Sequence, residues 1–164
     1  MRYTPRMAKR YWLMKSEPEV YSIADLQKDG TSGWEGVRNY QARNSMRDDM
    51  KDGDLVLFYH SNAKPSGVAG VAKVHGPPVP DPSQFDKKSE YYDAGSTRAE
   101  PRWLMARIAF MEKFAQVVPL EVMKADQALT GMPVLQKGQR LSVQPVSTEH
   151  FGRVLKLAGA KTKP

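Results

Sequence analysis

The sequence predicts an α+β domain in which short helices pack on a curved, mostly antiparallel sheet or small barrel. Runs typical of strands are mixed with short helical segments along the 164 residues. The run 55–59 is continuously apolar, as expected of a strand buried on both faces. The run 67–75 follows it after a short loop, so the two runs are expected to pair as a hairpin.

The first elements are expected to be one strand and one capped helix. The aromatic and aliphatic run 11–14 predicts the strand, and Pro18 stops it because proline lacks a main-chain donor. Ser22 is a suitable N-cap for a short helix over 23–28, and Gly30 is a suitable end for it.

A loop with glycines at 33 and 36 carries Trp34. The segment 38–50 is expected to be a helix or helical turn. The segment 76–102 is long, polar and rich in proline, which is typical of a functional or partly mobile loop. After it, the patterns predict a strand over 103–114, a short helix over 120–128, a strand over 141–146 and a helix that starts at Ser147 or Thr148 and ends at Gly159.

One domain is expected over 11–158, between a flexible leader (1–10) and a flexible tail (159–164). The leader is basic but lacks the apolar region of a secretory signal. No apolar run approaches the ~18 residues of a membrane span. We therefore expect a cytoplasmic, monomeric protein with no membrane partner.

The formal net charge is +7 and the pI is about 9.6. This charge favours a polyanionic partner such as nucleic acid, although a basic protein without such a partner has the same composition. The absence of cysteine excludes disulfides and thiol nucleophiles. The three histidines are not spaced as metal ligands, so we expect no metal site. The sequence contains neither a nucleophile elbow nor a phosphate-binding loop, so we expect no enzymatic activity.

The segment 34–44 (WEGVRNYQARN) concentrates side chains suited to a flat, hydrogen-bonding ligand. Aromatic faces can stack on a nucleobase, amides can pair with its edge, and guanidinium groups can hold phosphates. A second polar group, Tyr59-His60-Ser61-Asn62, directly follows the apolar strand. Together the two segments predict a small pocket on a basic protein.

Six segments in this order resemble the EVE domain, found in the thymocyte nuclear protein family and its bacterial relatives: 11–18 (YWLMKSEP), 34–44, 53–62 (GDLVLFYHSN), 67–74 (GVAGVAKV), 81–86 (DPSQFD) and 140–146 (RLSVQPV). The resemblance implies a PUA-like pseudobarrel, no catalytic machinery and no cofactor. It also implies kinship with YTH domains, which hold a methylated base in an aromatic cage. Trp34 resembles the first cage tryptophan. The second has no counterpart, because the next tryptophan, Trp103, follows the long loop.

The predicted site joins these segments. Trp34 would stack on the base, Asn39 and groups near 59–62 would contact its edge, and Lys15, Arg38 and Arg43 would hold phosphates. Structural alternatives stay open: Trp34 and Trp103 as core residues, Asn39 and Asn44 as helix caps, and His60 as a hydrogen-bonded structural histidine. The full set of predicted site residues is Lys15, Ser16, Trp34, Val37, Arg38, Asn39, Tyr40, Arg43, Asn44, Tyr59, His60, Ser61 and Asn62.

The predicted function is non-catalytic binding of a modified nucleobase in DNA or RNA. One alternative is a small-molecule or nucleotide-binding enzyme that uses the same pocket. Another is a regulatory module whose pocket takes a peptide or a metabolite.

Overall fold

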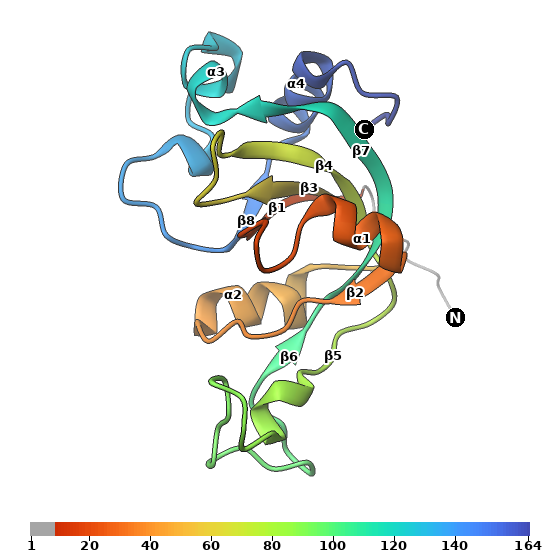
Figure 1. The fold of residues 1–164 in the computed structure, drawn as a ribbon, viewed down its shortest axis with the longest axis vertical. Coiled ribbons are helices and arrows are strands. Elements are labelled where there is room, and N and C mark those ends of the chain that lie inside the picture. Colours follow the sequence, from red (N-terminus) through yellow and green to blue (C-terminus); the bar gives the residue numbers. More distant parts are fainter. Residues whose placement is uncertain (1–8) are drawn as a thin grey trace, which may run out of the picture.

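A curled six-stranded sheet forms the centre of the fold, with strand order β2-β7-β4-β3-β1-β8 (Figure 1). The computed structural model describes residues 9–164. The strands are β1 (Tyr11–Ser16), β2 (Thr31–Gly33), β3 (Leu55–His60), β4 (Gly67–Val74), β7 (Arg107–Pro119) and β8 (Val143–Val146). All neighbours pair antiparallel except β1 and β3, which are parallel. The predicted α+β class with a mostly antiparallel, curved sheet is confirmed.

Short helices cover both faces of this sheet. They are α1 (Ile23–Asp29), α2 (Tyr40–Asn44), α3 (Leu120–Lys124) and α4 (Thr148–Ala158). A π-helical turn (Ser45–Asp49) follows α2, and 3-10 turns lie at Pro82–Phe85, Gln127–Leu129 and Pro133–Leu135. A two-stranded sheet of β5 (Val79–Pro80) and β6 (Leu104–Met105) carries the long loop, which projects beyond α2 (Figure 1).

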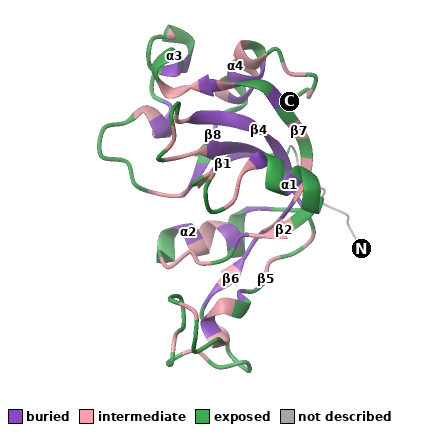
Figure 2. Ribbon diagram, in the orientation of Figure 1, coloured by how far each residue is buried: buried purple, intermediate pink, exposed green. Residues whose placement is uncertain are grey.

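Strand alternation divides the core between the two faces of the sheet. Tyr11 and Leu13 of β1 belong to a cluster with side chains of α3 and α4, whereas Trp12 and Met14 belong to a cluster with side chains of α1 and α2. Every side chain from 55 to 59 is less than 5% exposed. Strand β3 is therefore buried on both faces, as predicted. Figure 2 shows the same buried band through the centre of the sheet.

The buried carboxylate of Asp54 links the turn that precedes β3 to strand β1. Asp54 is 1% exposed. It accepts hydrogen bonds from the Trp12 indole Nε1 at 3.0 Å, the Lys51 main-chain N at 2.9 Å and the Arg10 main-chain N at 3.0 Å. The indole donor is itself buried, so this acceptor satisfies a group that would otherwise be orphaned.

The amino terminus of α1 is capped by side chains from two segments. Ser22 and Asp25 form a capping box, as the choice of Ser22 predicted. From the end of β3, His60 Nε2 accepts a hydrogen bond from the main-chain N of Ile23 at 3.1 Å. The structural interpretation of His60 is confirmed. Burial lowers the pKa of its imidazole.

Several boundaries differ from the prediction. The helix expected over 38–50 begins at Tyr40 because the Asn39 side chain caps it, and it tightens into a π-helical turn after Asn44. The strand expected over 103–114 is interrupted at Ala106, whose main chain bonds to Trp34 and to Met46 Sδ instead of to a strand. The predictions missed β2, since its sequence, TSG, carries no apolar signal.

Other differences lie at element ends. The first strand extends to Ser16, the third helix ends at Lys124, and the last strand begins at Val143. In the segment assigned to a flexible tail, the main-chain N–H groups of Lys161 and Thr162 donate to Glu112. Most of the predicted leader lies outside the described residues. Within 9–164, no helix combines the length and the hydropathy that a membrane crossing requires.

Replacing Asp54 with alanine is expected to lower the free energy of unfolding by about 3 kcal/mol, because the Trp12 indole N–H then stays buried without an acceptor. Urea denaturation measures this change. Asp49→Ala, at an exposed position of the preceding turn, is the control and should stay within about 0.5 kcal/mol of the parent. A similar stability for both variants would contradict this role for Asp54.

His60 is expected to make stability depend on pH. Its pKa is lower in the folded protein, so the unfolded chain takes up the proton first as the pH falls below about 6.5. The free energy of unfolding then decreases until the folded-state pKa is passed. His60→Gln keeps an acceptor but cannot titrate, so the advantage of the parent over it should shrink from pH 7.5 to pH 5.5 in urea unfolding. His75 and His150 are present in both proteins, and a constant difference across this range would refute the assignment.

Candidate functional site

A cavity of about 680 Å³ opens beside the carboxyl end of β1. Its walls come from β1, the segment 32–39, the loop before α1 and the long loop 76–102. Six predicted site residues line it: Lys15, Ser16, Trp34, Val37, Arg38 and Asn39. The volume lies within the range of pockets that hold small organic ligands.

Trp34 is both a core residue and a wall of the cavity. Its side chain is 7% exposed and meets the Phe58 ring edge-on, with centroids 5.5 Å apart. The indole nitrogens of Trp12 and Trp103 donate to Asp54 and Asp93, but that of Trp34 has no acceptor within residues 9–164. This nitrogen is also not among the side-chain atoms sealed from solvent there without a partner. Trp34 therefore lines the cavity and carries an indole N–H donor that has no acceptor in the described chain and is not sealed from solvent.

The end of β1 supplies one charged and one structural side chain. The Lys15 ammonium donates to the Gln139 main-chain O at 3.3 Å, and burial lowers its pKa. The Ser16 hydroxyl donates to the Tyr21 main-chain O at 2.7 Å, which holds the loop that forms the next wall. Lys15 thus brings a partly desolvated cation to the rim.

Asn39 and Arg43 combine local hydrogen bonds with free donors. Asn39 Oδ1 accepts from the Ala42 main-chain N at 3.0 Å, so the helix-cap alternative is confirmed, while its Nδ2 has no acceptor in the described chain. Arg43 donates through Nε and Nη2 to Asn44 Oδ1 and through Nη1 to the Arg102 main-chain O. A guanidinium has five N–H donors, so two of them remain for a ligand.

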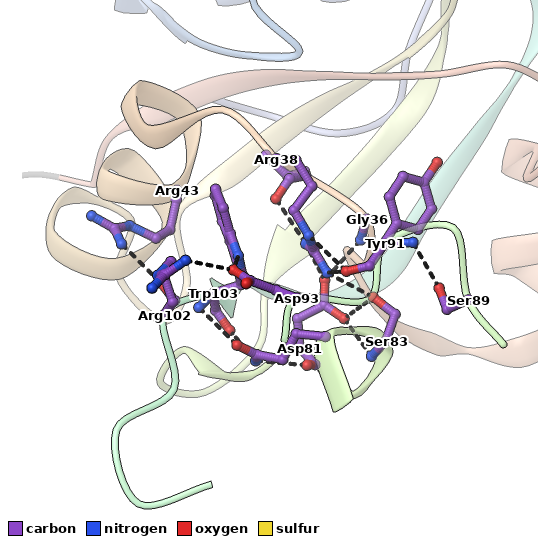
Figure 3. Close-up of polar contacts among 12 residues, drawn as sticks. Gly36, Arg38, Arg43, Asp81, Ser83, Ser89, Tyr91, Asp93, Arg102 and Trp103 are labelled. Carbon is purple, nitrogen blue, oxygen red and sulfur yellow. Dashed lines mark hydrogen bonds and ion pairs between the residues drawn. The ribbon is translucent and has the colours of Figure 1, made fainter. Parts of the chain in front are cut away.

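Arg38 is held by the protein through its entire guanidinium (Figure 3). Its contacts are Tyr91 O from Nε and Nη2, Val37 O and Asp81 from Nη1, and the Ser83 hydroxyl from Nη2. These contacts use all five N–H donors of the side chain. The buried Asp81 partner is 2% exposed. Burial raises the pKa of Asp81, but hydrogen bonds from Ser83, Gly36 and Arg38 outweigh it and hold that pKa below its usual range.

Three predicted residues gather around Trp103 instead of the cavity. The exposed ring of Tyr40 stacks on Trp103 with centroids 4.9 Å apart. The Arg43 guanidinium lies over both rings, and Asn44 orients that guanidinium. Trp103 is 6% exposed, which confirms the expectation that it is buried.

The segment 59–62 lies away from the main cavity. Tyr59 is 4% exposed and belongs to the core on the α3 and α4 face, which corrects its placement at the pocket. Ser61 donates its main-chain N–H to Ser16 O at 3.0 Å. His60 and Asn62 line a second depression of about 510 Å³, and the Asn62 amide donates to Glu17.

Several lining residues were not predicted: Val20, Tyr21, Ser32, Gly33, Glu35, Gly36, Tyr91 and Ser142. Two of them had a signal in the sequence. Tyr91 is one of two adjacent tyrosines in an otherwise polar loop, and Glu35 lies inside the segment already selected. The others depend on distant segments meeting in space. Across residues 9–164, no group of three or more His, Cys, Asp or Glu residues is arranged to hold a metal ion.

Comparison with known proteins identifies the family. A sequence model described as the EVE domain matches residues 10–157. Human thymocyte nuclear protein 1 is 43% identical over 165 residues, which cover 90% of this chain and 73% of the relative. The chicken protein of the same name is 40% identical over 169 residues, 92% of this chain and 69% of the relative.

Solved structures agree with this comparison. A protein from Pseudomonas syringae is 44% identical with a TM-score of 0.85, covering 90% of this chain and 99% of that one. Human THYN1, solved in complex with DNA containing 5-methylcytosine, is 39% identical with a TM-score of 0.84, covering 95% of this chain and all (100%) of that one. The predicted PUA-like architecture is that of these relatives. The chain belongs to the EVE domain family.

Proposed function

We propose that this chain binds DNA carrying a modified cytosine and takes the modified base into the cavity beside β1. The observation that carries the proposal is that Trp34 lines the cavity while its indole N–H has no acceptor within residues 9–164. The human relative solved with 5-methylcytosine DNA supports the choice of ligand. A base in a duplex has to leave the stack to reach such a cavity.

The hydrogen-bonding groups of the cavity suit the edge of a base. Trp34 Nε1 and Asn39 Nδ2 are donors without protein acceptors in the described chain, and the Glu35 carboxylate at the rim is an acceptor that has no partner there either. A mixed set of this kind complements cytosine, which presents the amino group N4 beside ring acceptors. Apolar surface from Val20, Val37 and Trp34 lies next to these groups and suits a methyl substituent.

Under this proposal, the phosphates are contacted by cationic side chains whose N–H donors are not all used by the protein. Lys15 lies at the rim, and Arg43 retains two N–H groups after its contacts to Asn44 and Arg102. The formal net charge of +7 adds a general attraction to a polyanion. A free nucleoside or neutral metabolite in the same cavity would bind with little salt dependence, which separates that alternative from DNA and RNA.

Binding without chemistry is the mode that this site supports. His60, the one histidine near the predicted pocket, uses Nε2 to accept from Ile23 N and lines the other depression. The groups of the main cavity are amide, indole, guanidinium, ammonium and hydroxyl groups with a single carboxylate, and these are better suited to holding than to proton transfer.

Replacing Trp34 with phenylalanine should weaken binding to an oligonucleotide with one 5-methylcytosine about tenfold, because it removes a hydrogen bond and part of the stacking surface. Trp12→Phe is the matched control. It also truncates a buried indole, at 1% exposure, but outside the cavity. It should lose stability and keep affinity. Fluorescence anisotropy with the modified strand, its unmodified twin and the RNA of the same sequence measures the change. Equal affinity of the Trp34→Phe variant and the parent refutes the assignment of Trp34.

Modified oligonucleotides incubated with the protein should return with unchanged mass, because most side chains that line the cavity are suited to holding a base and not to reacting with it. Mass spectrometry of the strand after prolonged incubation is the measurement, and a heat-denatured sample is the control. Release or alteration of a base by the native protein alone would show that the site is catalytic.

A further inference from the structure

The long loop is fixed against the cavity at its beginning. Asp81 accepts from the Gly36 main-chain N at 2.8 Å and from Arg38 Nη1 at 3.1 Å. It also accepts from the main-chain N and the hydroxyl of Ser83. A buried carboxylate with this many donors is well satisfied, so it holds the start of the loop against the segment 36–38.

The end of the loop is closed by a second set of contacts (Figure 3). Asp93 accepts from the Trp103 indole Nε1 at 2.8 Å and from Arg102 Nη1 at 2.9 Å. Gln84 is fully buried at 0% exposure, and its side-chain amide donates to the main-chain O of both Asp81 and Trp103. The two ends of the loop are thereby joined to each other.

This framework places the Tyr91 ring at the cavity. The Tyr91 main-chain O accepts two hydrogen bonds from Arg38, at 3.1 and 2.8 Å. A Cβ atom at Gly36 would lie 2.7 Å from the ring, so the ring rests directly on the main chain of Gly36. Tyr91 lines the cavity and is 38% exposed. An exposed aromatic ring fixed from behind is suited to stacking on a base.

We propose that Tyr91 is a base-contacting residue that forms the second aromatic wall of the cavity, and that Arg38 is a positioning residue for Tyr91 and holds no phosphate. This inference rests on the proposed function and adds a specificity-determining residue to it. It gives the long loop a role as a fixed wall.

Tyr91→Leu tests the wall, and Tyr92→Leu is its matched control. The two tyrosines are adjacent and equally exposed, at 38% and 39%, but only Tyr91 lines the cavity. Tyr91→Leu should weaken binding of a 5-methylcytosine oligonucleotide about tenfold, with Tyr91→Phe close to the parent, and Tyr92→Leu should leave binding unchanged. Equal affinities for the two leucine variants overturn the assignment. If the parent itself shows no preference for any modified strand, the proposed function fails instead.

Arg38→Gln separates positioning from phosphate binding. The variant should bind more weakly with the salt slope of the parent, and it should add no further loss in a Tyr91→Leu background. A phosphate contact would instead flatten the slope by about one unit and act independently of Tyr91. Ser83→Ala removes a single partner of Arg38 and keeps its charge. It should weaken binding by less than Arg38→Gln, with the salt slope of the parent and no further loss in the Tyr91→Leu background. A flatter slope for Arg38→Gln, or a loss in Ser83→Ala that adds to that of Tyr91→Leu, refutes the positioning role.

Discussion

The parallel pairing of β1 and β3 determines where this protein can have a site. The two strands are inner strands of a sheet covered on both faces, and their side chains are apolar until the last residues. Because the strands run in the same direction, they end together, with Ser16 opposite His60. Polar groups therefore meet at one edge of the sheet. The main cavity opens beside β1 at that edge, and the second depression opens beside β3.

The two faces of the sheet have different roles: one is occupied by apolar core, and the other also contributes to the main cavity. The face under α3 and α4 holds a closed apolar core, and no residue of that core lines the main cavity. The face under α1 and α2 holds Trp34, which contributes to core packing and to the cavity wall. The ion pair of buried Asp81 with partly buried Arg38 contributes little to apolar burial. Such a pair is best understood as a device that fixes geometry, here that of the long loop against the segment 36–38 that precedes α2.

The sequence predicted what local rules control. The strand 55–59 and the cap Ser22 follow from residues that are neighbours in the chain, and the structure confirms them. Of the two caps predicted for the last helix, Ser147 or Thr148, the structure has Ser147. The face of Tyr59 could not be predicted, since a run that is apolar at every position gives no alternation to orient it. The contacts of Arg38 were equally hidden, because its partners Asp81 and Tyr91 lie 43 and 53 residues away. An arginine in a polar segment looks the same whether it faces solvent or an internal carboxylate.

Because all five N–H donors of Arg38 are used by the protein, the geometry of this wall also affects the rate constants of ligand binding. A wall held by the protein's own hydrogen bonds is ordered when the chain folds, so the entropy of fixing it does not oppose association. Under the proposed function, ligands that differ by one methyl group would reach the cavity with similar association rate constants. The protein would distinguish them through differences in the dissociation rate constant.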